Sequence, residues 1–280
     1  MTALALVRER DAADERVKEA YRDVKESLRV SFVDAVFQAY AIDPKFLDHT
    51  WRRLRPSVLS APFIAQARLT ADIADRGVES WNVSNHAAAL HARNYGDIEV
   101  RKLREVAEVF HTIHPRLLII AYAVKAALAG EPVGGGGAPH DQTSLDRGKL
   151  MRDFRGVRVQ FADDRDAPLR VRTIYEEIAR AARQPIVGAL YRAMGAYPDW
   201  LEIFWSDARP TLGDVRRAAL ARSLRKAASE AAKLVPYPLN MPMEGFAEMA
   251  AVNDALCELL PELAIDGAIA RRGLGVEPAS

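Results

Sequence analysis

Apolar residues recur at three- and four-residue spacing along most of the chain, which is the pattern of amphipathic and buried helices. Val17, Tyr21, Val24 and Leu28 are a clear example. Alternation typical of a β-strand is confined to the short stretch 157–164. The sequence therefore predicts an all-α fold. Prolines predict several helix starts, because proline at the first helical position loses no hydrogen bond: Pro44, Pro62, Pro115, Pro198 and Pro261.

The two halves of the chain carry the same pattern at an offset of 154 residues. Residues 17–56 align without a gap to residues 171–210, and 11 of these 40 positions are identical. Chance would give roughly 3. We predict two tandem helical repeats, residues 1–130 and 151–280, related by a pseudo-twofold axis as in a homodimer. Residues 131–150, rich in glycine and proline, are typical of a flexible linker.

Composition narrows the classes of function. Lys and Arg number 39 against 38 Asp and Glu, so the formal charge is +1. This balance argues against a nucleic-acid partner. No apolar run reaches membrane-spanning length, and the N-terminus lacks the features of a signal peptide. A single cysteine, Cys257, excludes an internal disulfide and has the spacing of a core residue. Together these features predict a cytoplasmic protein without a membrane partner.

Positions at which the halves differ are the candidates for a single site between them. Asp34 lies in an apolar stretch, and its counterpart in the second half is Gly188. A carboxylate in such surroundings must be solvated, paired or functional. We interpret Asp34 as a buried carboxylate beside an open space in a pocket between the repeats. The alternative is that Asp34 faces solvent near Gln38.

The stretch HTIHP contains two histidines, His111 and His114, which have no counterpart in the second half. Because a residue before proline is pushed out of the α region, we place His114 at a helix N-cap. The two imidazoles then need not share a face and no further ligand lies nearby, so we expect neither a metal nor another cofactor. A histidine there can face a bound anion or act as a general base. The alternative is a capping histidine packed at the junction.

Three stretches, residues 21–53, 110–124 and 131–135, resemble the first half of the group I 2-haloacid dehalogenases. The resemblance covers most of the chain and is carried by the order and spacing of residues. It implies an all-α fold of two repeats with the active site between them. It also implies hydrolysis of 2-haloalkanoic acids by direct attack of water, with no covalent intermediate and no metal.

The residues that the family uses are replaced in this sequence. The family's asparagine before the proline falls on His114, and its pocket tryptophan falls on Phe32. Its aspartate falls on Leu190, which cannot act as a base, and a small hydroxyl residue falls on Ala189. Either the catalytic pair has moved to Asp34 and His114, or this branch has kept the fold and lost dehalogenation.

The first hypothesis is accordingly a cofactor-independent hydrolase acting on a small organic acid. His114 would be the base and Asp34 would orient it, which requires the two side chains within hydrogen-bond reach, directly or through one water. A non-catalytic protein that binds a small ligand is the alternative. A redox role for Cys257 lacks a second cysteine. A homodimer is left open. The expected substrate contacts are Phe32, Phe37, His111, Gly188, Ala189 and Leu190.

Overall fold

The computed structural model describes residues 4–135, 151–164, 166–241 and 245–276. Throughout this part the regular secondary structure is helical, which confirms the predicted all-α class. Residues 157–164, the candidate strand, form irregular chain and a turn. Residues 136–150 of the predicted linker lie outside the described ranges.

The helices follow one another with short connections. In the first half they are α1 (Glu15–Leu28), α2 (Ala35–Tyr40), α3 (Pro44–Val58), α4 (Ala61–Val78), α5 (His86–His91) and α6 (Asp97–Leu128). In the second half they are α8 (Leu169–Ala181), α9 (Ala189–Gly195), α10 (Pro198–Ala208), α11 (Val215–Lys233) and α12 (Ala247–Gly273). Two short 3₁₀ helices, Glu9–Asp11 and Arg209–Thr211, complete the set.

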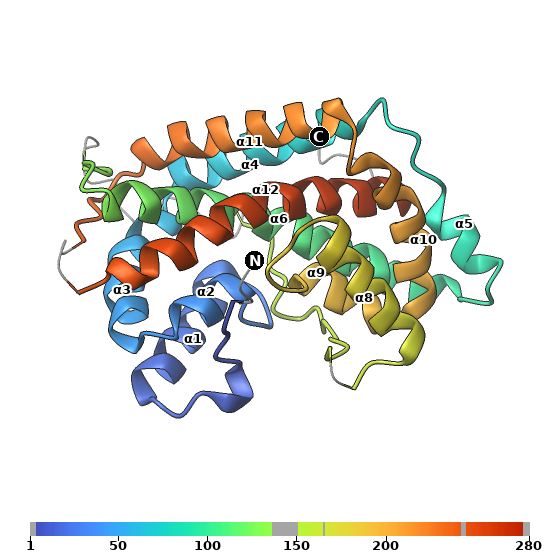
Figure 1. The fold of residues 1–280 in the computed structure, drawn as a ribbon, viewed down its shortest axis with the longest axis horizontal. Helices are drawn as coiled ribbons and strands as arrows, with labels where there is room; N and C mark the ends of the chain where they lie inside the picture. Colours follow the sequence, from blue (N-terminus) through green and yellow to red (C-terminus); the bar gives the residue numbers. More distant parts are fainter. Residues whose placement is uncertain (1–3, 136–150, 165, 242–244, 277–280) are drawn as a thin grey trace.

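The long helices α6 and α12 pack along each other through the centre of the molecule (Figure 1). Helices α4 and α11 contact this pair and each other on one side. On the opposite side, α1 to α3 lie towards one end and α8 to α10 towards the other (Figure 1). The short helices α2 and α9 therefore begin near the middle of the molecule, below the α6–α12 pair.

Two predicted helix starts are wrong. Pro115 and Pro261 lie inside α6 and α12, which continue through them. An internal proline removes one backbone hydrogen bond and costs about 3 kcal/mol. Burial of the apolar residues around Pro115 outweighs this, since each buried aliphatic side chain contributes about 1.5–3 kcal/mol. Pro44, Pro62 and Pro198 do lie in the first turns of their helices.

Candidate functional site

A pocket of about 270 Å³ lies where α2 and α9 begin. The first residues of the two helices, Ala35 and Ala189, line it together with the aromatic rings of Phe32 and Phe161. The structure therefore brings together Phe32 and Ala189, two residues that the sequence placed in one pocket. Charged side chains complete the lining of this α2–α9 pocket: Arg8, Glu9, Arg10, Asp163 and Arg192.

Asp34 is the N-cap of α2, a position that favours aspartate because its carboxylate satisfies a free backbone N–H. Its Oδ1 accepts a hydrogen bond from the Val36 N–H at 3.1 Å. Its Oδ2 is enclosed and has no hydrogen-bond partner, and the residue is 3% exposed. Burial raises the pKa of Asp34 to about 6, against the lowering effects of the Val36 hydrogen bond and the charge of Arg192. The solvent-facing alternative is therefore wrong.

Arg192, on α9, is a functional candidate that the sequence reasoning missed. Its guanidinium lies over the Phe161 ring at 5.5 Å and pairs with Asp164 at 3.6 Å. Its Nε is enclosed without a hydrogen-bond partner, and burial lowers its pKa. One signal was available, because its counterpart in the first half is the uncharged Gln38.

The N-terminal segment also reaches the pocket. Its backbone is tied to α2 by a hydrogen bond from the Val7 N–H to the Gln38 carbonyl at 3.0 Å. Arg8 and Arg10 both pair with Asp163, so a segment that precedes the first long helix contacts the chain before α8. The lining of the pocket carries three guanidinium groups and two carboxylates, which makes it suited to an anionic ligand.

His114 lies in the middle of α6 and is fully buried, so its predicted place at a helix N-cap is wrong. Its Nδ1 is 3.0 Å from the Leu263 carbonyl, which requires the proton on Nδ1. Nε2 is then an acceptor, enclosed and without a partner. Burial lowers the pKa of His114 to about 3. The expectation that this histidine titrates near neutrality is therefore wrong, because the charged ring would lose its hydration.

The direct hydrogen bond expected between Asp34 and His114 is absent. The Asp34 Oδ2 and the His114 Nε2 each lack a partner, and their other polar atoms are bonded elsewhere. The imidazole reaches the pocket wall only through aromatic neighbours. Its ring centroid lies 5.4 Å from that of Phe110, which lies 5.4 Å from that of Phe32.

The space beside Gly188 is filled, which corrects the expectation of an open volume there. A Cβ at Gly188 would lie 2.8 Å from the Leu263 Cδ2. Leu190 is fully buried and is not part of the lining of the α2–α9 pocket. Phe37 is also buried and packs on Trp51 at 5.3 Å rather than lining that pocket. Both side chains project from the apolar faces of short helices, where core contacts absorb them.

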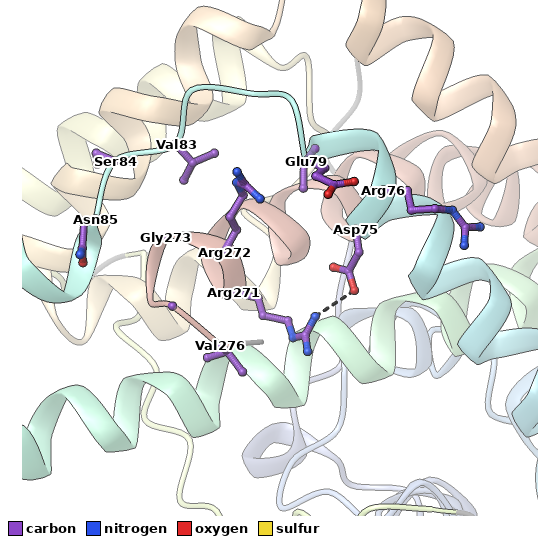
Figure 2. A pocket seen from close by; sticks show the side chains of 12 residues that line it. Asp75, Arg76, Glu79, Val83, Ser84, Asn85, Arg271, Arg272, Gly273 and Val276 are labelled. Carbon is purple, nitrogen blue, oxygen red and sulfur yellow. Dashed lines mark hydrogen bonds and ion pairs between the residues drawn. The ribbon is translucent and has the colours of Figure 1, made fainter. Parts of the chain in front are cut away.

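His111 belongs to a different cluster. Its Nε2 is 2.9 Å from the Asp75 carboxylate, which also pairs with Arg271 at 2.9 Å. Figure 2 shows this Asp75–Arg271 pair at the wall of a second, larger pocket of about 550 Å³, between the end of α4 and the end of α12. His111 is therefore held by an ion-pair cluster and is absent from the lining of the α2–α9 pocket.

Cys257 is buried on α12, and burial raises the pKa of its thiol to about 12. A thiol with that pKa is protonated at neutral pH and is a poor nucleophile. Within the described ranges, no three His, Cys, Asp or Glu side chains lie close enough to hold a metal ion. None of the described helices is long and apolar enough to cross a membrane.

Comparisons with known proteins agree with this picture. An (R)-2-haloacid dehalogenase from Pseudomonas putida is 28% identical over 205 residues, covering 71% of this chain and 66% of that protein, or just under two thirds of its length. An (R)-2-haloacid dehalogenase from Rhizobium sp. (strain NHG3) is 26% identical over 236 residues, covering 82% and 88%. A solved D-2-haloacid dehalogenase in complex with L-LA superposes with a TM-score of 0.87 at 22% identity, covering 98% and 97%.

The likeness to the solved structure, at this identity, establishes a shared fold. A family model described as "Halocarboxylic acid dehydrogenase DehI" matches residues 31–183, more than half of the chain. The relatives named above bear the same assignment, which the stretches around Phe32 and His114 had indicated. The chain therefore belongs to this family, the group I 2-haloacid dehalogenases.

Proposed function

We propose that the protein is a cofactor-independent hydrolase of small carboxylic acids, of the 2-haloacid dehalogenase type, acting in the α2–α9 pocket. One observation carries the proposal. A buried carboxylate with a free oxygen, on Asp34, adjoins a pocket that contains the incompletely bonded guanidinium of Arg192. A base beside an anion-binding group is the equipment for attack by water on a carboxylate-bearing substrate.

In the proposed reaction, Asp34 accepts a proton from a water molecule as the oxygen of that water attacks the carbon that bears the halogen. The carbon–halogen bond breaks, and the halide leaves with the bonding electrons. The products are a 2-hydroxy acid, a halide ion and a protonated Asp34, which then releases its proton to solvent. Attack from the face opposite the halogen would invert the configuration at this carbon.

Asp34 suits the role of base better than His114. A general base works best when its pKa lies near, and below, the working pH. The pKa of Asp34, about 6, leaves its carboxylate ionised at neutral pH and more basic than an ordinary aspartate. The pKa of His114, about 3, makes its ring a weak base. We therefore assign the base to Asp34 and give His114 the task of fixing Leu263 through its Nδ1–H.

The substrate carboxylate would bind Arg192. A planar guanidinium matches the two oxygens of a carboxylate, and a hydrogen bond between charged groups contributes about 1.5–3 kcal/mol. The rings of Phe32 and Phe161, 5.2 Å apart, would pack against the carbon and halogen atoms. The proposed ligand is thus a small organic acid with its charged end at α9.

The two-repeat organisation, residues 1–130 and 151–280, remains part of the proposal. It is supported by equivalent contacts in the two halves. The Trp51 Nε1–H donates to Asp23 at 2.7 Å, and the Trp205 Nε1–H donates to Glu177 at 2.9 Å. A pseudo-twofold axis would put the α2–α9 pocket between the repeats, where each half contributes one of its short helices.

The test is halide release from each enantiomer of 2-chloropropionate by the purified protein. We expect turnover of at least one enantiomer, with the 2-hydroxy acid of opposite configuration as product by chiral chromatography. Absence of halide release from both enantiomers, in protein shown to be folded by circular dichroism, would contradict the proposal.

One observation favours a second candidate, a non-catalytic protein that binds small acids. Leu190, at the position where the family resemblance implies an aspartate, is fully buried and apolar. Calorimetric titration with lactate, which lacks a halogen, separates the candidates. Binding of lactate without turnover of either chloropropionate would support the binding protein.

A further inference from the structure

Three arginines in the described part of the chain are buried. Arg116 is 5% exposed, Arg217 is 2% exposed and Arg271 is 4% exposed. Two of them each contact two carboxylates, as expected for a charge removed from water. These pairs are Arg217 with Glu262 at 2.7 Å and Asp266 at 2.9 Å, and Arg271 with Asp75 at 2.9 Å and Glu108.

Arg116 is the exception. It follows Pro115 on α6 and points to the end of α1, where its Nη1 donates to the Leu28 carbonyl at 3.4 Å. That distance is longer than an ordinary hydrogen bond. Its Nε is enclosed without any partner. Among residues 4–135, 151–164, 166–241 and 245–276, no carboxylate forms an ion pair with it.

The side chain is nevertheless charged at neutral pH. Burial lowers the pKa of Arg116 only to about 10, and the positive charges of Arg68 and Arg29 lower it further in the same direction. Three guanidinium groups are therefore near one another at this point. The Arg29 Nη1 donates to the Met151 carbonyl, which neutralises no charge.

The end of α1 compensates this charge only in part, because a helix C-terminus carries about half a negative charge. An unsatisfied buried group in a native structure generally indicates a bound water or ion. We propose that Arg116, with Arg29 and Arg68 near it, forms a binding site for a small inorganic anion of the halide type. The site lies among α1, α4 and α6 and is separate from the α2–α9 pocket.

The test is thermal unfolding of the full chain in sodium bromide and in sodium gluconate of equal ionic strength. Gluconate is too bulky for an enclosed guanidinium. Because a ligand that binds only the folded state raises its stability, we expect bromide at 100 mM to raise the Tm by about 2–4 °C over gluconate. Arg116→Met keeps an unbranched side chain without the charge, and should lose this difference between the salts.

Arg222→Met, which removes an exposed arginine from α11, is the matched control and should keep the bromide effect. Crystals grown in bromide should show an anomalous scattering peak beside the Arg116 guanidinium. Equal Tm values of the native protein in both salts would overturn the proposal and leave Arg116 as a cap of α1. A bromide effect of full size in Arg116→Met would also overturn it. Neither readout depends on turnover, so failure of the proposed hydrolase activity would remain distinguishable.

Discussion

Helices α2 and α9 begin at opposite sides of one pocket, and their first turns differ in chemistry. The N-cap of α2 is Asp34, whose second carboxylate oxygen is free, whereas the N-cap of α9 is Gly188, whose space is filled by Leu263. Four residues after each cap the order of charge reverses, with Gln38 on α2 and Arg192 on α9. The two helices thus supply complementary groups, a carboxylate from one and a guanidinium from the other.

The comparison teaches that duplication of a helical unit builds the scaffold, and divergence between the copies makes the site. A base and an anion-binding group on the same helix would neutralise each other as a local pair. When each group comes from a different helix, the space between them remains available to a substrate. The proposed chemistry therefore depends on the asymmetry between the two first turns.

Replacing the carboxylate of α2 should have the largest effect. In Asp34→Asn the amide still caps the helix but cannot accept a proton from water. Loss of a general base lowers rates by about 10²–10⁴-fold, and we expect kcat for halide release to fall by this factor. Asp43→Asn, which changes the equivalent cap of α3 outside the pocket, should retain kcat. Equal losses in the two variants would remove Asp34 from the mechanism.

The pH dependence of stability sharpens the same contrast. Because the folded protein raises the pKa of Asp34 from 3.8 to about 6, the folded state binds the Asp34 proton more tightly than the unfolded state does. The stability that this contributes is fully present below pH 4 and is lost as the pH rises through 6. Its size is roughly 3 kcal/mol. Urea unfolding of the native protein and Asp34→Asn between pH 4 and 8 should show this difference in slope.

The same ionisation predicts that kcat rises with pH through about 6, since only the carboxylate accepts a proton. A profile of kcat with no inflection between pH 5 and 7 would contradict the assignment of the base. His114→Asn tests the competing assignment. It should lower stability through the Leu263 contact without moving that inflection, whereas a histidine base would lose it.

On the other side of the pocket, Arg192→Met removes the guanidinium of α9 and keeps much of the apolar stem. If Arg192 binds the substrate carboxylate, KM should rise by about 10- to 100-fold, because a charged hydrogen-bonding pair is lost. Initial rates over a range of substrate concentrations would separate this from an effect on kcat. Arg172→Met, at an exposed position on α8, is the control and should leave KM unchanged.

The smallest effect is expected at Gly188. In Gly188→Ala the added methyl group would meet Leu263, so the leucine or α9 must shift. Overpacking of this kind costs about 1–3 kcal/mol. Chemical denaturation should show the loss, and an unchanged midpoint would mean that Leu263 adjusts without strain. Asp34 itself should keep its pH dependence in this variant.

The sequence by itself determined the helical class, the family resemblance and the positions at which the two halves differ. Helical periodicity is a local property, so the spacing of Val17, Tyr21 and Val24 was enough to predict a helix there. The pairing of Phe32 with Ala189 in one pocket was also predictable, because the resemblance to a two-repeat family placed them there.

Only the tertiary structure decided the protonation and the surroundings of the candidate groups. Burial sets the pKa of Asp34 and of His114, and burial depends on helices distant in sequence. The continuity of α6 through Pro115 depends on its contacts with α12, which outweigh a local preference of about 3 kcal/mol. The meeting of Arg192 with Asp34 is likewise a result of packing, because no spacing along a single helix could predict it.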